Sequence, residues 1–340
     1  MEKVEEIQHK TLRVNGLNMH IAEMGQGPIV LFLHGFPELW YSWRHQMPFV
    51  AAHGYRAVAL DLRGFGDTTG APEDDFTKFT TLHVVGDIVE LLNIIAPDQE
   101  KVFVVGHDWG AMIAWALCFY RPDKVNALVN MTVPFAPRNP IIRPIARLRA
   151  TYGDEYYIIR FQEPGEIEEE FAKIGTKTVL EKLLTNRNPE PLMLPKGKPF
   201  DESPVKLPPW LTEKDVDYYA SKYQQTGFTG GLNYYRALDL NWELTAPWTG
   251  AKVKVPVKFI VGDLDITYNA AGVKDYIHKG GFKKDVPLLE DVVIFKGVAH
   301  FLPQEKPDEV NKQILDFLQG FSSSDQRFCT LKFLWSSITS

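Results

Sequence analysis

A five-residue segment at 106–110, with the sequence Gly-His-Asp-Trp-Gly, constrains the fold of this chain more than any other segment. It has the Gly-x-Ser-x-Gly frame of a sharp strand-to-helix turn, but aspartate stands in the place of serine. Apolar residues at 102–105 precede the segment, and an apolar, helix-like run at 111–117 follows it. The pattern predicts a buried strand, a tight turn that presents Asp108, and a helix.

The aspartate changes the chemistry that such a turn supports. Serine must lose a proton before it attacks, whereas a carboxylate, with a reference pKa of about 3.9, is already ionised near pH 7. A carboxylate that attacks a saturated, electrophilic carbon forms an ordinary ester, which histidine and water can hydrolyse. Asp108 is therefore the candidate nucleophile of an alkyl-transferring hydrolase. The alternative is that Asp108 simply caps the helix that begins at Trp109.

Strand and helix signals alternate along the chain on both sides of a long helical insert. Before the insert, an Asn15-Gly16 hairpin joins the first two of six expected strands. Continuous apolar runs among the other strands are typical of parallel strands that are buried on both faces. The six expected strands are 12–14, 19–22, 29–33, 57–60, 102–105 and 125–129. After the insert, strands are expected at 257–261 and 292–295.

Helices are expected near 40–52, 80–95, 270–278 and 306–318, and a long loop rich in proline is expected at 189–209. The alternation predicts an α/β fold with a mostly parallel sheet, helices on both faces and right-handed crossovers. The helical cap enters after the sixth strand and covers the carboxyl edge of the sheet, where ligands bind in such folds.

The break in the alternation gives the expected domain organisation. Residues 1–134 form the first part of the core, 135–250 the helical cap and 251–320 the second part of the core. A C-terminal tail at 321–340 has no predicted order, and its three serines at 322–324 are typical of a linker.

Composition narrows the class of protein. A net charge of -6 over 340 residues argues against a nucleic-acid partner. Cys118 and Cys329 do not make a disulfide framework, and Cys118 is expected to be a buried thiol. The charged N-terminus and the lack of a long apolar run predict neither a signal peptide nor a membrane span, and so a cytoplasmic protein. Neither a metal-ligand spacing nor a nucleotide-binding fingerprint occurs, so no metal or cofactor is expected.

An acid and a histidine follow the last two strands, in the order that this fold requires after the nucleophile. Asp263 and Asp265 come directly after the strand at 257–261, and His300 follows the strand at 292–295. His300 is the candidate base. Asp265 is the candidate that orients its imidazole, and Asp263 is the alternative for that role.

The loop after the strand at 29–33 supplies the remaining candidates. The backbone N–H groups of Phe36 and Trp109 are expected to form an oxyanion hole, and Glu38 is placed to hold the attacking water. His34 and His107 are interpreted as structural histidines, and Asp61 and Arg63 as an ion pair that fixes a loop.

Two segments carry a family resemblance. Residues 34–44 (His-Gly-Phe-Pro-Glu-Leu-Trp-Tyr-Ser-Trp-Arg) and 106–110 closely resemble the plant soluble epoxide hydrolases of the α/β-hydrolase family. The likeness covers roughly residues 6–320 and includes the cap segments 160–165 and 233–238.

The resemblance implies roles for these residues. Asp108 is the nucleophile, His300 the base and Asp265 its partner, while Glu38 orients water. Two cap tyrosines that polarise the epoxide oxygen fall on Tyr157 and Tyr235, with Tyr156 and Tyr234 as neighbouring alternatives.

The implied substrates are lipophilic epoxides, including epoxy fatty acids, which are converted to vicinal diols without a cofactor. The epoxide and water are the expected partners, and the protein is expected to be a monomer or a homodimer. A haloalkane dehalogenase and a non-catalytic ligand-binding protein are the alternative functions. Cap tyrosines, and Phe36 where dehalogenases commonly carry Asn, argue against the first. The complete set of site residues argues against the second.

Overall fold

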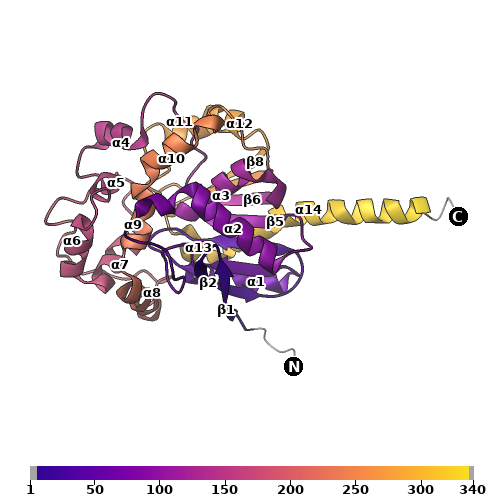
Figure 1. Cartoon of the computed structure of the whole chain (residues 1–340), viewed down its shortest axis with the longest axis horizontal. Coiled ribbons are helices and arrows are strands. Elements are labelled where there is room, and N and C mark those ends of the chain that lie inside the picture. Colours follow the sequence, from indigo (N-terminus) through magenta and orange to yellow (C-terminus); the bar gives the residue numbers. More distant parts are fainter. Residues whose placement is uncertain (1–5, 337–340) are drawn as a thin grey trace.

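The computed structural model describes residues 6–336 and the side-chain surroundings of residues 6–321. Its centre is an eight-stranded sheet in the order β1-β2-β4-β3-β5-β6-β7-β8 (Figure 1). The hairpin β1–β2 and the pair β2–β4 are antiparallel. All other neighbouring strands in the sheet are parallel. The strands are β1 Gln8–Val14, β2 Leu17–Met24, β3 Ile29–Leu33, β4 Arg56–Leu60, β5 Val102–His107, β6 Val125–Met131, β7 Val257–Gly262 and β8 Leu289–Phe295.

The central strands are apolar because helices cover both faces of the sheet. Every residue of β3 and β7 is buried. One face packs against α1 and the first part of α14, and the other against α2, α3, α11 and α12. These helices, with the short α13, are α1 Gln46–Ala52, α2 Thr81–Ile95, α3 Trp109–Tyr120, α11 Val273–His278, α12 Gly281–Asp285, α13 Leu302–Glu305 and α14 Pro307–Ser336. The predicted α/β class and mostly parallel sheet are confirmed.

The helix expected near 40–52 is divided. A short 3-10 turn, Trp40–Trp43, precedes α1, which begins only at Gln46. Pro48 has no N–H to donate, so it is tolerated in the first turn of a helix but not in its interior. A continuous helix from residue 40 would place Pro48 in that interior.

The predicted helical insert lies between β6 and β7, so the cap follows the sixth strand as expected. It packs over the carboxyl ends of the strands, at the left of Figure 1. Its helices are α4 Pro144–Tyr152, α5 Tyr157–Arg160, α6 Glu166–Ile174, α7 Thr176–Leu184, α8 Glu213–Thr226, α9 Thr229–Arg236 and α10 Leu238–Leu244. The expected loop at 189–209 contains neither helix nor strand. The domain boundaries themselves stay a prediction.

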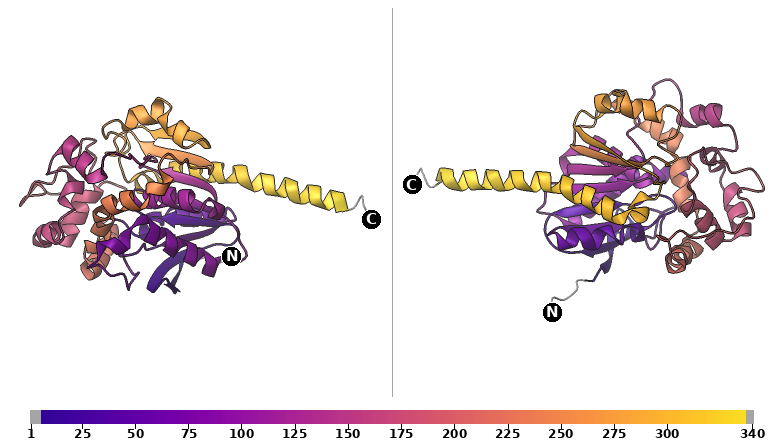
Figure 2. Two further views of the ribbon diagram at one scale, coloured as in Figure 1. Left: turned by 45° about the horizontal axis from the view of Figure 1, so that its top comes forward. Right: turned by 180° about the vertical axis from the view of Figure 1, so that it is seen from behind.

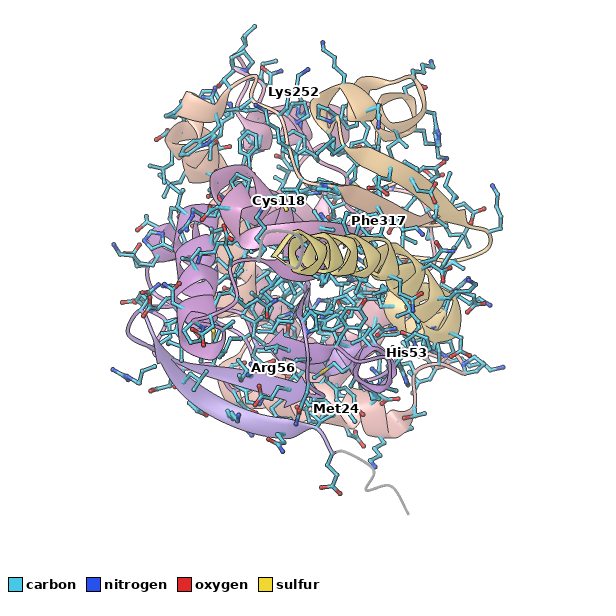
Figure 3. All side chains as sticks on the ribbon, turned by 90° about the vertical axis from the view of Figure 1, so that its right-hand side faces the viewer. Met24, His53, Arg56, Cys118, Lys252 and Phe317 are labelled. Carbon is cyan, nitrogen blue, oxygen red and sulfur yellow. The ribbon has the colours of Figure 1, made fainter. Side chains whose placement is uncertain are left out.

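The last helix corrects one expectation. Helix α14 passes over the sheet, where Val310, Ile314 and Phe317 pack, and then continues beyond it, at the end of the molecule opposite the cap (Figures 1, 2 and 3). The expected linker at 322–324 is wrong, because the helix runs through these serines to Ser336. Serine is less favourable than alanine in a helix by only a few tenths of a kcal/mol, which does not stop a helix that is already formed.

Two further expectations concern burial and charge. Cys118 on α3 is fully buried, as expected; its side chain is labelled in Figure 3. The expected ion pair between Asp61 and Arg63 is wrong. Arg63 instead donates from Nε and Nη2 to the two oxygens of Asp87 on α2, at 2.8 and 2.7 Å.

In the part of the chain that the structure describes, no helix is both long and apolar enough to cross a lipid bilayer.

The Arg63–Asp87 pair gives a test of stability. Both side chains are buried, so Asp87→Ala leaves an uncompensated guanidinium and is expected to lower the free energy of unfolding by about 3–5 kcal/mol. Arg121 and Asp123 form a pair of the same bidentate geometry on the surface. Asp123→Ala is the matched control and is expected to cost about 1 kcal/mol or less. Urea unfolding measures both values, and equal losses would contradict the assigned role of burial.

Candidate active site

Asp108 sits at a strained turn between β5 and α3. Its backbone has φ 53° and ψ -120°, a conformation that L-residues rarely adopt. Glycine on either side makes this turn possible. A Cβ on Gly110 would lie 2.0 Å from the carbonyl oxygen of Leu33, and one on Gly106 would lie 2.5 Å from Oδ1 of Asn130. The two glycines of the 106–110 segment therefore let the turn pack directly against β3 and β6.

The side chain of Asp108 turns towards the cavity. Oδ1 accepts a hydrogen bond from the backbone N–H of Phe36 at 2.7 Å, and Oδ2 lies 3.3 Å from Nε2 of His300. The carboxylate makes no capping hydrogen bond to α3. Gly35 allows this approach, because a Cβ there would lie 2.4 Å from Cβ of Asp108. The geometry thus rejects the interpretation of Asp108 as a helix cap.

His300 is held between two carboxylates. Its Nδ1 lies 3.1 Å from both oxygens of Asp265, while its Nε2 faces Asp108. Asp265 is fully buried, and its Oδ1 also accepts from the backbone N–H and the hydroxyl of Thr267. Asp263 points elsewhere: its Oδ1 accepts from the backbone N–H of Gly297. Of the two acids after β7, Asp265 is the one that contacts the imidazole.

The charges of this triad shift two pKa values in opposite directions. Burial acts to lower the pKa of His300, but the charges and hydrogen bonds of Asp265 and Asp108 outweigh it, so the pKa lies well above its ordinary value. Burial acts to raise the pKa of Asp108, but the hydrogen bond and charge of His300 outweigh it, so this pKa is lowered. Both shifts favour the charged forms, a carboxylate at Asp108 and an imidazolium at His300.

Two cap tyrosines lie opposite Asp108. Tyr157 opens α5 and Tyr235 lies on α9, with ring centroids 6.0 Å apart, and both line the cavity that contains Asp108. The loop after α7 fixes the first one, because the N–H of Tyr157 donates to the carbonyl oxygen of Leu192. Burial, joined by the nearby charge of Asp108, raises the pKa of both phenols well above 10. Both therefore stay protonated and can donate hydrogen bonds.

The neighbouring tyrosines lie differently. The hydroxyl of Tyr234 donates to the carbonyl oxygen of Arg63 at 2.8 Å, and the ring is fully buried between β-sheet and cap. Tyr156 stacks on Tyr152 with centroids 4.4 Å apart and faces the larger part of the cavity. Tyr157 and Tyr235 border both parts of the cavity where these meet at Asp108.

Glu38 lies behind the site rather than in the cavity. It is fully buried; Oε2 accepts from the N–H of Gly35 and pairs with Nδ1 of His107 at 2.6 Å, and Oε1 accepts from Nε2 of Gln304. Nε2 of His107 donates to the carbonyl oxygen of His300 at 2.8 Å. Glu38 is thus joined to the backbone of His300 through His107. Its contact with a water molecule stays a prediction.

His34 and His107 form structural hydrogen bonds, as expected. Nδ1 of His34 donates to the carbonyl oxygen of Gly35 at 2.8 Å, and its Nε2 accepts from the N–H of Leu62 at 3.0 Å. His107 has partners at both ring nitrogens. Both side chains hold loops at the carboxyl edge of the sheet.

The candidate oxyanion donors flank Asp108. The N–H of Phe36 already contacts Asp108, and Trp109 opens α3, where an N–H has no partner within the helix.

A residue that the sequence did not single out connects the loops around Asp108. Thr132, just after β6, has φ 70°; its hydroxyl accepts from the N–H of Asp108 and its carbonyl oxygen from the hydroxyl of Thr267. No local pattern in the sequence marks it.

The cavity has two arms that meet at Asp108, Tyr157, Tyr235 and Ile266. The narrow arm has a volume of about 50 Å³ and extends past His300. The wide arm has a volume of about 410 Å³ and extends below the cap towards α4 and α10. Both arms are lined mainly by apolar side chains, so the site suits a lipophilic molecule whose reactive centre rests at the junction.

Outside the cavity, three side chains of the kinds that bind metal ions lie close together: His20, Asp61 and Asp67. Nδ1 of His20 pairs with Asp61 at 2.8 Å, and Asp67 forms an ion pair with Lys222. Internal partners therefore already engage these groups, and the absence of a metal or cofactor stays a prediction.

The chain is similar to known proteins in both sequence and structure. A family model described as the alpha/beta hydrolase fold matches residues 28–307. Epoxide hydrolase 1 of Siraitia grosvenorii is 57% identical over 318 residues, which are 94% of this chain and 100% of that protein. Epoxide hydrolase A of Mycobacterium tuberculosis is 34% identical over 90% of this chain and 95% of its own length. The structure of potato (Solanum tuberosum) epoxide hydrolase I superimposes with a TM-score of 0.91 at 63% identity, over 93% of this chain and 100% of that chain.

The triad geometry predicts which acid controls His300. Asp265→Asn removes one of the two charges that raise the pKa of the imidazole, so this pKa is expected to fall. Asp263→Asn is the matched control and is expected to leave it unchanged, because Asp263 contacts Gly297 instead. Nitrogen-detected NMR titration of the His300 ring measures the shift. A fall in both variants, or in neither, would contradict the assignment.

Proposed function

Because this chain belongs to the plant epoxide hydrolases of the α/β-hydrolase family, we propose that Asp108 opens the epoxide ring by direct attack and is released by water. The observation that carries the proposal is the position of the Asp108 carboxylate. It is free of helix-capping contacts, lies 3.3 Å from the imidazole of His300 and borders the cavity junction below two protonated tyrosines. These positions support the presence of a nucleophile, a base and proton-donating groups around the cavity junction.

The first step forms the ester. Asp108 attacks one epoxide carbon, the carbon–oxygen bond of that carbon breaks, and the ring oxygen takes the electron pair. Tyr157 and Tyr235 donate to this oxygen and lower the cost of an alkoxide leaving group. Their raised pKa values support this role, because a phenol that stays protonated can donate in the ground state and throughout the step.

The second step hydrolyses the ester. An ester at Asp108 carries no charge, so one of the two carboxylates that raise the pKa of His300 is lost when it forms. The pKa of the imidazole then falls, and the proton that His300 releases neutralises the alkoxide. His300 is left as a neutral base while Asp265 holds its Nδ1. The base takes a proton from water, which attacks the ester carbonyl carbon. The N–H groups of Phe36 and Trp109 stabilise the resulting oxyanion. When this intermediate collapses, the bond between the carbonyl carbon and the alkyl oxygen breaks, the imidazolium of His300 gives its proton to that oxygen, and the vicinal diol leaves. The acid form of Asp108 then gives its proton to His300, which restores the starting pair.

Glu38 is proposed to position the attacking water. Because its oxygens are engaged by Gly35, His107 and Gln304, the proposal includes an effect through His107, which holds the carbonyl oxygen of His300. The finer substrate class is also a proposal. The apolar lining of the wide arm supports lipophilic epoxides, including epoxy fatty acids. The cytoplasmic location and the monomeric or homodimeric state stay predictions.

The two alternatives from the sequence find less support. A haloalkane dehalogenase needs donors around a halide, whereas the residue after Gly35 offers an apolar side chain, Phe36, and the cap presents two phenols instead. A non-catalytic binding protein does not need a strained turn, which commonly costs about 1–3 kcal/mol and persists where it serves a site.

The covalent step predicts that an intermediate can be trapped. In His300→Gln, Asp108 is still able to attack, but no base activates water, so the ester is expected to accumulate in stoichiometric amount. Mass spectrometry of the digested protein is expected to find the mass of one epoxide added to the peptide that contains Asp108. The double variant that also carries Asp108→Asn is the control and should show no adduct. Finding no adduct in His300→Gln despite bound epoxide would refute the covalent route.

The tyrosines are predicted to act in the first step. Tyr157→Phe and Tyr235→Phe are each expected to lower the rate of ester formation by roughly 10²-fold or more, because each removes a donor to the alkoxide. Tyr234→Phe is the matched control. It removes a hydroxyl that donates to Arg63, so it is expected to lower the free energy of unfolding by about 1 kcal/mol and to retain the rate. Stopped-flow measurement of a single turnover gives these rates.

A further inference from the structure

The cap carries an unusual run of charge. Residues 133–153 contain four arginines and no acidic residue, in a chain whose net charge is -6. These arginines lie before and along α4, beside the wide arm of the cavity. Such a run either pairs with acids from elsewhere in the fold or leaves cations available for a ligand.

The four arginines divide according to where they lie. Arg143 pairs with Glu243, and Arg149 pairs with Asp154; neither lines the cavity. Arg138 and Arg147 do line the wide arm, and no carboxylate among the described residues lies within ion-pair distance of either. The arginines outside the cavity are neutralised, and those that face it are not.

Arg138 is also held in place. Its Nε donates to the carbonyl oxygen of Trp242 at 2.7 Å, its Nη1 donates to the hydroxyl of Thr249 at 2.8 Å, and its guanidinium lies 4.2 Å above the ring of Trp242. All three contacts are to uncharged groups. They orient the half-buried cation and leave Nη2 without a partner among the described residues. The N–H groups of Nη2 can therefore donate to a carboxylate, in a charge-assisted hydrogen bond.

The charges along the rest of the cavity favour an anion at the end of the wide arm that is far from Asp108. Among the described residues that line the wide arm, the one other charged side chain is Asp108, which repels an anion from the junction. The narrow arm, about 50 Å³ against about 410 Å³, has no arginine or lysine in its lining, and its His300 is already paired with Asp108 and Asp265. A long substituent that ends in an anionic group therefore fits the wide arm, and the shorter, uncharged substituent fits the narrow arm.

We propose that Arg138 and Arg147 form an anion subsite that receives the carboxylate at the end of the longer substituent of the epoxide. The inference rests on the proposed function, because it concerns the orientation of substrate in the same cavity. Arg138 supplies the oriented hydrogen bonds, and the exposed Arg147 adds charge at the cap. Both act as specificity-determining residues, and the chemistry at Asp108 does not depend on them.

The test compares two substrates that differ only in charge, a long-chain epoxy fatty acid and its methyl ester, each below its micelle concentration. The wild-type protein is expected to have the lower KM for the acid. Arg138→Gln is expected to raise KM for the acid by roughly 10-fold or more, because it removes a hydrogen-bonding cation. Arg147→Gln is expected to raise it by about 2- to 5-fold, since the residue is exposed. Neither should change KM for the ester.

Arg149→Gln is the matched control, because Arg149 lies on α4 with Arg147 but faces away from the cavity. It should leave the ratio of the two KM values unchanged. All three variants should retain the wild-type kcat for styrene oxide, a short neutral epoxide, which shows that the fold and the reacting groups are intact. If Arg138→Gln fails to fold, Arg147→Gln alone decides the outcome.

Equal KM values for acid and ester in the wild-type protein, or a ratio that Arg138→Gln and Arg147→Gln leave unchanged, would overturn the subsite. Calorimetric binding of the corresponding dihydroxy fatty acid and its methyl ester gives a second readout that needs no turnover. If the wild-type protein hydrolyses none of the three epoxides, the proposed function fails. Weaker binding of the dihydroxy acid to the two cavity variants, but not to Arg149→Gln, would then still support the subsite.

Discussion

The backbone turn at Asp108 is the constraint on which the site depends. Its conformation, φ 53° and ψ -120°, is one that commonly costs about 1–3 kcal/mol, so the surrounding structure must hold it. β3 and β6 do so through close contacts that only glycine allows at positions 106 and 110. Because the turn packs directly on β3, the loop after β3 also lies within hydrogen-bond distance of the carboxylate. The strained turn at Asp108 thus lies next to the loop that follows β3.

Electrostatic coupling links this turn to the last two parallel strands. His300 lies between Asp108 and Asp265, and two negative charges beside one imidazole raise its pKa well above the ordinary value. In the proposed mechanism, forming the ester removes one of those charges. The imidazole then changes from a cation that stabilises the nucleophile to a base that activates water. In this proposal the same contact serves both steps, because the charge of Asp108 differs between them.

The cap contributes what the sheet does not. A parallel sheet brings the loops that follow its strands to one edge, but the groups opposite that edge must come from an insert. Tyr157 and Tyr235 come from two different cap helices and meet above Asp108. The cap also divides the cavity into unequal arms and places arginines along the larger one. The scaffold thus positions the reacting groups, while the cap shapes the space that a substrate occupies.

The sequence alone determined the sheet, the inserted cap and the positions of Asp108, Asp265 and His300 after strands, because apolar periodicity and turn motifs are local signals. Its choice of Tyr157 and Tyr235 rested on resemblance, since adjacent tyrosines share one local pattern. The tertiary structure decided pairings between distant segments: Arg63 pairs with Asp87 rather than Asp61, Glu38 pairs with His107, and Arg138 pairs with no acid among the residues whose side chains the structure describes. Side-chain partners across a fold depend on how elements pack, and residue order does not encode that packing in any short segment.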